Sequence, residues 1–242
     1  MTYLYDGSFE GLLTAVFYVY QEKRLQASLW SQSNEQQPLD QLREVAPEEE
    51  KARRVLEGCR KKVSRDFCNQ LYLLYLADTP QSGNIILQYI IDGLRYGPSV
   101  SQRLQLPSVH NAFVLRNKVT AETHRFKGLV RFRKFRQVLL ADIEPDHNIL
   151  PVLHPHFGRR LPGENWLIRD TRRKYAAIHF EGATQLAAYE DAEIPVEISD
   201  EYEEIWREFY RAIAIKERAN PRLQRNYMPK RYWKNLVETW QA

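Results

Sequence analysis

The spacing of apolar residues changes near Arg125, and this change limits the fold more than any other feature of the chain. Before it, apolar residues recur at intervals of three and four, as they do from Phe9 onward, which is the pattern of amphipathic helices. After it come short apolar runs bounded by turn residues, at 125–135 and 137–145, which are typical of strands. The chain therefore predicts an α+β fold, in which a mainly helical N-terminal half precedes a small antiparallel sheet flanked by helices.

The helical half is predicted to begin with a short strand and turn over residues 2–7, followed by a helix that Ser8 caps. The polar stretch 28–47 is interpreted as an exposed connection. A second helix is expected from Pro47 to Gly58 or beyond, since proline suits the first turn and the glutamates after it favour the helix dipole. The helical pattern continues in three further segments, at 64–78, 82–97 and 107–124.

The second half is predicted to contain two pairs of strands. The first pair joins the two apolar runs that follow Arg125, and the second is a hairpin over 165–182. A short proline-bounded helix is expected between the pairs, over 148–165. An amphipathic helix is expected from Ser199 until just before Asn220-Pro221, and a last helix should hold Tyr232, Trp233, Leu236, Val237 and Trp240.

Composition and length are those of an ordinary globular protein, with one domain over 1–242 or a subdivision into a helical region, 1–106, and a sheet-containing region, 107–242. The two cysteines, Cys59 and Cys68, are too few for an iron–sulfur cluster and form no disulfide framework. Apolar runs stay well short of the roughly 18 residues of a membrane helix, and the sequence contains no nucleotide-binding fingerprint. We therefore expect a cytoplasmic protein without a membrane partner, a metal ion or another cofactor.

Charge is segregated along the chain, although its net value is only +4. Residues 116–136 hold eight Lys and Arg against one Glu, and residues 207–234 hold nine Lys and Arg against two acids. Residues 189–205, by contrast, hold eight acids and no base. Two separate basic blocks are the electrostatic pattern expected of a protein that contacts phosphate backbones.

The strand expected at 125–135 would gather its basic side chains on one face, because successive side chains of a strand point to opposite faces. Taken alone, the pattern fits a solvated strand whose apolar face packs on helices. Together with the second basic block, it favours an anion-binding surface. Aromatic and guanidinium groups of the 165–182 hairpin are candidates for stacking on unpaired bases, although a core tryptophan is more common there. The predicted nucleic-acid contacts are Arg125, Lys127, Arg131, Arg133, Arg136, Arg160, Trp166, Arg173, Arg222, Arg225, Lys230 and Arg231.

Two groups of residues are candidates for chemistry. His154 and His156 lie two residues apart, but no cysteine or carboxylate nearby completes a metal-ligand spacing. We expect these histidines to form hydrogen bonds in a pocket, to bind a phosphate or to shape a turn. Asp142, Glu144 and Asp170 are expected near strand ends, where carboxylates hold the two metal ions of some nucleases. Pairing of these acids with the abundant arginines is the simpler interpretation.

Five stretches occur in order along the chain: YLYDGSFEGLLTAVF, HRFKGLVRFRKF, ADIEPDHNILPVLHPHFGRR, NWLIRDTRRKYA and NPRLQRNYMPKRYWKNLVE. Together they resemble a bacterial family of DNA metabolism proteins. The resemblance implies a gene neighbour that is a radical SAM protein of DNA modification or repair. Some members of that family are fused to a uracil-DNA glycosylase-like domain. The family has no assigned activity, so the resemblance implies context and partners but no catalytic residues.

These observations predict an accessory nucleic-acid-binding protein of bacterial DNA repair or modification, which acts on DNA with a radical SAM partner. The chain has neither cluster-binding cysteines nor a glycosylase motif, so we expect it to be neither of those enzymes. Two alternatives stay open. One is a metal-dependent nuclease or base-processing enzyme centred on the carboxylates and histidines, and the other is a protein–protein adaptor that makes no contact with nucleic acid.

Overall fold

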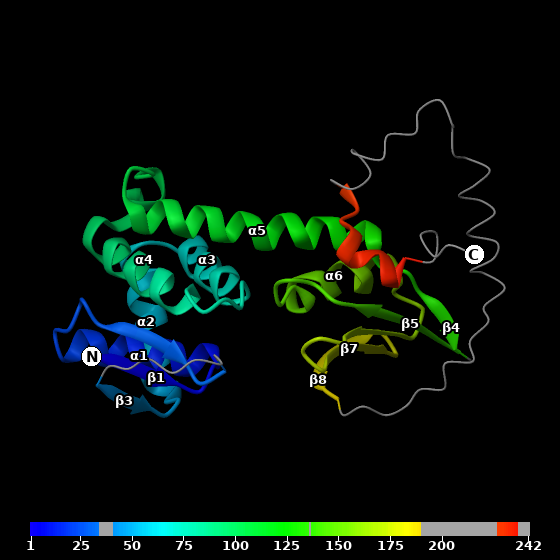
Figure 1. The fold of residues 1–242 in the computed structure, drawn as a ribbon, viewed down its shortest axis with the longest axis horizontal. Helices are drawn as coiled ribbons and strands as arrows, with labels where there is room; N and C mark the ends of the chain where they lie inside the picture. The colour runs from blue at the N-terminus through cyan, green and yellow to red at the C-terminus, as the bar shows by residue number, and fades with distance from the viewer. Residues whose placement is uncertain (34–40, 136, 190–226, 237–242) are drawn as a thin grey trace. The chain divides into compact units, whose positions relative to one another are not determined.

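The computed structural model describes residues 1–33, 41–135, 137–189 and 227–236 of the chain (Figure 1). The chain divides into two compact units, of which unit 1 is Met1–Thr120 and unit 2 is Ala121–Ala242. Each unit combines helices with a β-sheet, so the predicted α+β class is confirmed.

Unit 1 contains a three-stranded sheet in the order β2-β1-β3, in which all strands are parallel. Its strands are β1 (Thr2–Tyr5), β2 (Ser28–Ser31) and β3 (Leu42–Val45). The prediction of an exposed connection over 28–47 is wrong, because β2 and β3 both lie within it. Each has four residues and pairs with the distant strand β1, so no hairpin signal marks it in the sequence. Leu29 of β2 is nonetheless fully buried.

The helices of unit 1 are capped where the sequence provides hydroxyl side chains. They are α1 (Phe9–Gln21), α2 (Glu49–Lys62), α3 (Arg65–Tyr75), α4 (Ser82–Tyr96) and the 3₁₀ helix η1 (Gly97–Gln102). The predicted cap of α1 is confirmed, since the Ser8 hydroxyl accepts a hydrogen bond from the Gly11 N–H at 2.9 Å. Ser64 starts α3 in the same way, because its hydroxyl accepts from the Phe67 N–H at 3.0 Å.

Helix α5 (Pro107–Leu129) begins in unit 1 and ends in unit 2. It continues past the expected end, so the prediction of a strand over 125–135 is wrong for residues 125–129. A strand forms only at β4 (Arg133–Phe135), the last three residues of that segment.

The segment after His124 follows the helical period because its apolar residues are spaced for a helix as well as for a strand. Phe126 and Leu129 are three residues apart and both are buried, as neighbours on one face of a helix are. Arg125 and Lys127 therefore flank the buried face of a helix and do not line one face of a strand.

Unit 2 contains a five-stranded sheet in the order β4-β5-β6-β7-β8. Its other strands are β5 (Val138–Ile143), β6 (Trp166–Asp170), β7 (Tyr175–Phe180) and β8 (Ala183–Ala188). The β6–β7 hairpin is confirmed, but the expectation of an antiparallel sheet is wrong for β5 and β6, which are parallel. The cause is the expected helix between them, α6 (Leu150–Arg160), because a helical crossover returns the chain in the same direction.

Strand β8 was not predicted, because Ala-Thr-Gln-Leu-Ala-Ala contains no aromatic residue and a single β-branched residue. It is joined to β7 by a two-residue turn, in which Glu181 and Gly182 have φ angles of 47° and 79°. Positive φ at both central residues is the geometry of a tight hairpin turn. Helix α6 packs against β7 and β8 (Figure 1).

The described C-terminal segment contains the 3₁₀ helix η3 (Lys230–Asn235), which includes Tyr232 and Trp233 of the last predicted helix. Val237 and Trp240 of that prediction lie outside the described residues. The helix expected from Ser199 lies outside the described residues, as do the predicted contacts Arg136, Arg222 and Arg225. Within the described regions of the chain, no helix is long and apolar enough to cross a membrane.

Candidate functional site

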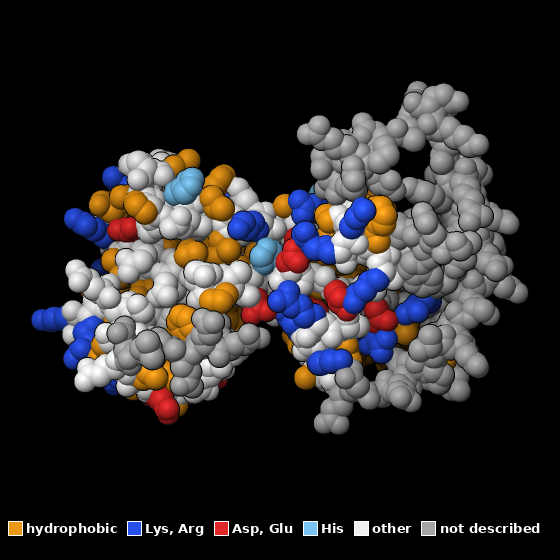
Figure 2. Space-filling model, viewed as in Figure 1, with side chains coloured by type: hydrophobic (Ala, Val, Ile, Leu, Met, Phe, Trp, Pro, Cys, Tyr) orange, Lys and Arg blue, Asp and Glu red, His pale blue; other side chains and the backbone are white. Residues whose placement is uncertain are grey.

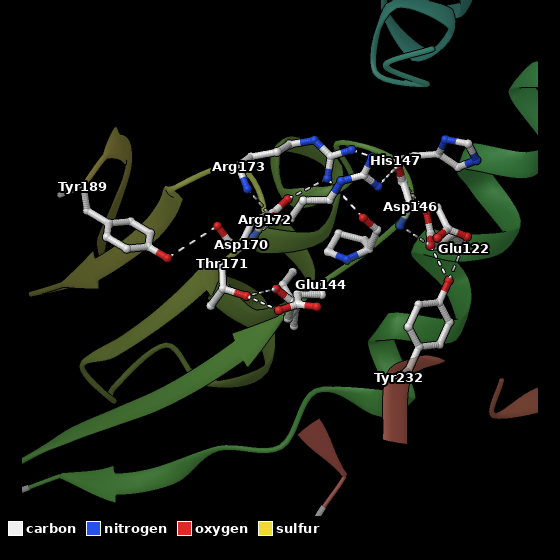
Figure 3. A network of polar contacts seen from close by, with 12 residues as sticks. Glu122, Glu144, Asp146, His147, Asp170, Thr171, Arg172, Arg173, Tyr189 and Tyr232 are labelled. Atoms are coloured by element: carbon white, nitrogen blue, oxygen red, sulfur yellow. Dashed lines mark hydrogen bonds and ion pairs between the residues drawn. The ribbon is translucent and has the colours of Figure 1, made fainter. Parts of the chain in front are cut away.

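The carboxyl ends of β5 and β6 lie side by side, and the segments that leave them meet there (Figure 3). Ile143 and Asp170, the last residues of these strands, are paired in the parallel register. The Thr171 N–H donates to the Ile143 carbonyl at 3.1 Å. The turn 171–174 therefore starts beside the loop 144–148, and both contain polar residues singled out from the sequence.

Asp170 is fully buried at this end of the sheet. Its Oδ1 accepts hydrogen bonds from the backbone N–H groups of Arg172 and Arg173, each at 3.1 Å. Its Oδ2 accepts from Nη1 of Arg173 at 2.9 Å. Burial raises the pKa of Asp170 above its ordinary value, although the adjacent guanidinium of Arg173 acts in the opposite direction. These contacts make Asp170 the anchor of the β6–β7 turn.

Arg173 links the turn to the loop 144–148. Its guanidinium donates to the carbonyls of Pro145 at 3.1 Å and Asp146 at 2.8 Å, in addition to its ion pair with Asp170. Arg172 also donates to the Asp146 carbonyl, at 3.3 Å. The two arginines reach across to the same loop, as Figure 3 shows.

Glu122 holds the other side of the loop from helix α5. This carboxylate is 2% exposed, and it accepts from the backbone N–H groups of Asp146 at 2.8 Å and His147 at 2.9 Å. It also accepts a hydrogen bond from the hydroxyl of Tyr232 in η3. Burial, and then the contact with Glu122, raise the pKa of Tyr232, so its hydroxyl stays protonated and donates.

Two further ion pairs attach η3 to the loop. Nη2 of Arg231 lies 2.6 Å from Oδ2 of Asp146, and Lys234 contacts Glu144. The hydroxyl of Thr171 donates to Glu144 at 2.9 Å. Burial acts to raise the pKa of Glu144, but Lys234 and Thr171 together leave it below its ordinary value. This carboxylate is therefore ionised at neutral pH, and it is paired with Lys234 and Thr171.

Asp142 lies between two arginines of neighbouring strands. It accepts from Arg133 of β4 at 2.9 Å and from Arg169 of β6 at 2.6 and 2.9 Å. The ring of Tyr189 lies 5.8 Å from the guanidinium carbon of Arg169. Pairing with basic residues, the simpler interpretation of the candidate carboxylates, thus describes the geometry of Asp142 and Asp170. No group of three or more His, Cys, Asp or Glu side chains among the described residues is placed to hold a metal ion.

His154 and His156 lie on α6. Nδ1 of His154 and Nε2 of His156 are buried and have no hydrogen-bond partner among the described residues. Burial lowers the pKa of His154. Burial also lowers the pKa of His156, and the positive charges of Lys127, Arg160 and Arg159 lower it further. Both imidazoles are therefore neutral near pH 7.

Among the described residues of unit 2, basic side chains outnumber acidic ones, and most of these acids make internal contacts. Its described residues include 14 Lys and Arg against 7 Asp and Glu. Five of the seven acids hold the loop, the turn and the sheet together in the contacts given above. Lys127, Arg159 and Arg160, which we call the cationic cluster, have no carboxylate partner in the described chain. On the face of unit 2 seen in Figure 2, blue basic side chains surround the red carboxylates.

Several of the predicted nucleic-acid contacts already make ion pairs or hydrogen bonds within the protein, or are buried. Arg133, Arg173 and Arg231 are ion-paired, and Arg131 donates to the Gly128 carbonyl at 2.7 Å. Trp166 is fully buried, and its ring stacks on that of His179 with 4.9 Å between centroids and 5° between planes. Of the remaining predicted contacts among the described residues, Arg125 and Lys127 are half-buried, and Arg160 and Lys230 are exposed. Nζ of Lys230 lies 5.7 Å from the centroid of the Trp233 ring.

Sequence reasoning missed two features of this region. Arg159 was not among the predicted contacts, although the Arg159-Arg160 pair at the end of α6 was visible in the sequence. The contact between Glu122 and Tyr232 spans 110 residues, and no local pattern in the sequence marks it.

A family model described as a domain of unknown function, DUF4130, matches residues 80–238, which is more than half of the chain and covers the site described above. No curated protein and no solved structure matches the chain.

Proposed function

We propose that this chain, which belongs to the DUF4130 family, is a nucleic-acid-binding accessory protein of DNA repair or modification. In this role the cationic cluster contacts phosphates and presents DNA to a catalytic partner. The resemblance of five stretches of the chain to a bacterial DNA metabolism family supports a radical SAM protein as that partner. In related proteins a fused uracil-DNA glycosylase-like domain would be the catalytic partner.

The observation that carries the proposal is the unequal use of charge in unit 2. Five of the seven acids in the described part of unit 2 make internal contacts. Arg159 and Arg160 lie three and four residues after His156 on α6, and, like Lys127, they have no carboxylate partner among the residues that the structure describes. Like charges held close together repel one another unless an anion lies between them. A phosphate backbone supplies such an anion at each nucleotide, and release of its counterions drives the binding.

The polar network of Figure 3 supports a binding role more than a catalytic one. Asp170 in that network is held by Arg173, and Glu144 is held by Thr171 and by Lys234. Asp142 is held by the guanidinium groups of Arg133 and Arg169. Carboxylates engaged in this way would have to lose those partners before they could bind metal ions. The network instead fixes the loop and the turn of unit 2 as a rigid support.

Fluorescence anisotropy with a labelled DNA duplex tests the proposal. The triple variant Lys127→Gln, Arg159→Gln, Arg160→Gln should bind much more weakly than the wild type, because three phosphate contacts are lost. The matched control is Arg60→Gln, Lys61→Gln, Lys62→Gln, which removes the same charge from the last turn of α2 in unit 1. Equal affinity of the two variants, or wild-type protein that does not bind, would contradict the proposal. Cleavage of the DNA would support the nuclease alternative instead.

A further inference from the structure

A groove lies between helix α4 and the first turns of α5 in unit 1. Its volume is about 650 Å³, which is within the range of about 300–1,000 Å³ of sites that hold small molecules. From α4 it is lined by Asn84, Gln88 and Asp92, which recur every four residues and therefore share one face of the helix. Ser108 and Asn111 line it from α5. Carboxamides, a hydroxyl and a carboxylate are therefore gathered in one groove.

Two hydrogen bonds within unit 1 decide what the groove offers to a ligand. The Leu29 N–H donates to Oδ1 of Asn84 at 2.8 Å, so the amide nitrogen of Asn84 is left as a donor. The hydroxyl of Ser108 donates to Oδ2 of Asp92 at 2.5 Å, so Oδ1 of Asp92 is left as an acceptor. The side chain of Gln88, one helical turn from each of them, makes no hydrogen bond to another described residue. The groove thus combines a fixed donor, a fixed acceptor and a carboxamide that can be either.

The charge of the groove limits what it can bind. Asp92 is the only charged residue among the described residues that line it, so it repels a phosphate or carboxylate group and favours a ligand N–H group. Ile85 and Pro107 add apolar surface, on which the face of a flat ring can pack. A carboxamide donates and accepts in one plane, as the hydrogen-bonding edges of nucleobases do. Asn and Gln pair in this way with N6 and N7 of adenine, and Asp accepts from N4 of cytosine.

We infer that this groove binds the base of adenosine or cytidine, with the exocyclic amino group donating to Asp92 and the rest of the base edge contacting Gln88. These two side chains lie one helical turn apart, about 6 Å along the axis, so one base can contact both. Hypoxanthine and uracil have a carbonyl oxygen in place of the amino group, and the carboxylate of Asp92 would repel it. The site lies in unit 1 and does not depend on the proposed function, which rests on residues of unit 2.

Isothermal titration calorimetry with the full chain tests the inference on two matched pairs of nucleosides, adenosine with inosine and cytidine with uridine. Within each pair a carbonyl group replaces the amino group, so adenosine and cytidine should bind about 5- to 150-fold more tightly than inosine and uridine. Adenosine monophosphate should bind no more tightly than adenosine, because the described lining residues include no cation.

Three variants assign the binding to the groove. Asp92→Asn replaces a carboxylate oxygen with an amide that can donate to a carbonyl group, so it should remove the preference within both pairs. Asp66→Asn, the same substitution at an exposed position of α3, is the matched control and should keep the preference. Gln88→Ala should weaken binding of adenosine and cytidine without loss of stability, because Gln88 is exposed on α4. Thermal unfolding of each variant checks its fold.

The outcomes are separate from those of the proposed function. If the wild type binds none of the four nucleosides, or binds the members of each pair equally, the inference is overturned. An unchanged preference in Asp92→Asn, or unchanged affinity for adenosine in Gln88→Ala, also overturns it. The proposed function survives each of these results, because it is tested by DNA binding of Lys127→Gln, Arg159→Gln, Arg160→Gln.

Discussion

Tyr232 donates a hydrogen bond to the buried carboxylate of Glu122, which precedes it by 110 residues in the chain. The same carboxylate accepts from two backbone N–H groups of the loop 144–148. One side chain of α5 therefore joins η3 to the end of the sheet in unit 2 (Figure 3).

Removal of the Tyr232 hydroxyl should destabilise unit 2. In Tyr232→Phe the Glu122 carboxylate stays buried but loses one of its donors, and a hydrogen bond to a charged group contributes about 1.5–3 kcal/mol. Urea unfolding should show a lower free energy of unfolding by this amount. Tyr227→Phe is the control, because Tyr227 is 69% exposed. Equal stability of the two variants would show that the contact contributes nothing.

Unit 2 should lose stability as the pH falls below neutrality. The pKa values of His154 and His156 are lowered in the folded protein, by burial and, at His156, by Lys127, Arg160 and Arg159. The unfolded chain therefore takes up protons first, so the stabilisation is complete above about pH 6.5 and is lost as the pH falls from there toward the folded values.

Unfolding measured between about pH 7.5 and pH 5.5 checks this dependence. The double variant His154→Asn, His156→Asn should have a flatter pH profile than the wild type, because it lacks both groups. His110→Asn, at an exposed position of α5, should keep the wild-type slope. If the double variant has the wild-type slope, the pH dependence of stability comes from titratable groups other than His154 and His156.

Substitution of Trp166 should leave the affinity for DNA unchanged. Its ring is fully buried against His179, so it cannot reach a base on the surface. Trp166→Phe keeps an aromatic ring in the core, although the smaller ring leaves a cavity and should lower stability. Anisotropy with single-stranded and duplex DNA should give wild-type affinities. A selective loss of single-strand binding would mean that the indole becomes accessible when DNA binds.

The sequence predicted best those elements whose signals are local. The Ser8 cap of α1 and the β6–β7 hairpin depend on neighbouring residues, and both are found where they were expected. Strands β2 and β3 escaped prediction because their stability comes from parallel pairing with β1, which adjacent residues do not reveal. Residues 125–129 were misassigned because their apolar spacing fits both a strand and a helix.

The candidate site was predictable in its residue types and not in its arrangement. The sequence identified Asp142 and Asp170 and anticipated their arginine partners. It did not reveal that Asp142 is shared by Arg133 and Arg169, because that arrangement depends on the order of strands in the sheet. Trp166 was predicted as a nucleic-acid contact, although a core tryptophan was the more common interpretation. It is fully buried, on the face of the sheet that α6 covers.

The salt dependence of DNA binding tests the central claim most directly. Affinity for a duplex, measured between about 50 and 200 mM salt, should fall linearly in a log–log plot. The slope should be shallower by roughly 2 to 3 in Lys127→Gln, Arg159→Gln, Arg160→Gln, because each phosphate contact adds about 0.9. The variant Arg60→Gln, Lys61→Gln, Lys62→Gln should keep the wild-type slope. A flat wild-type plot, or equal slopes in the wild type and both variants, would contradict the assignment of the cationic cluster to phosphate binding.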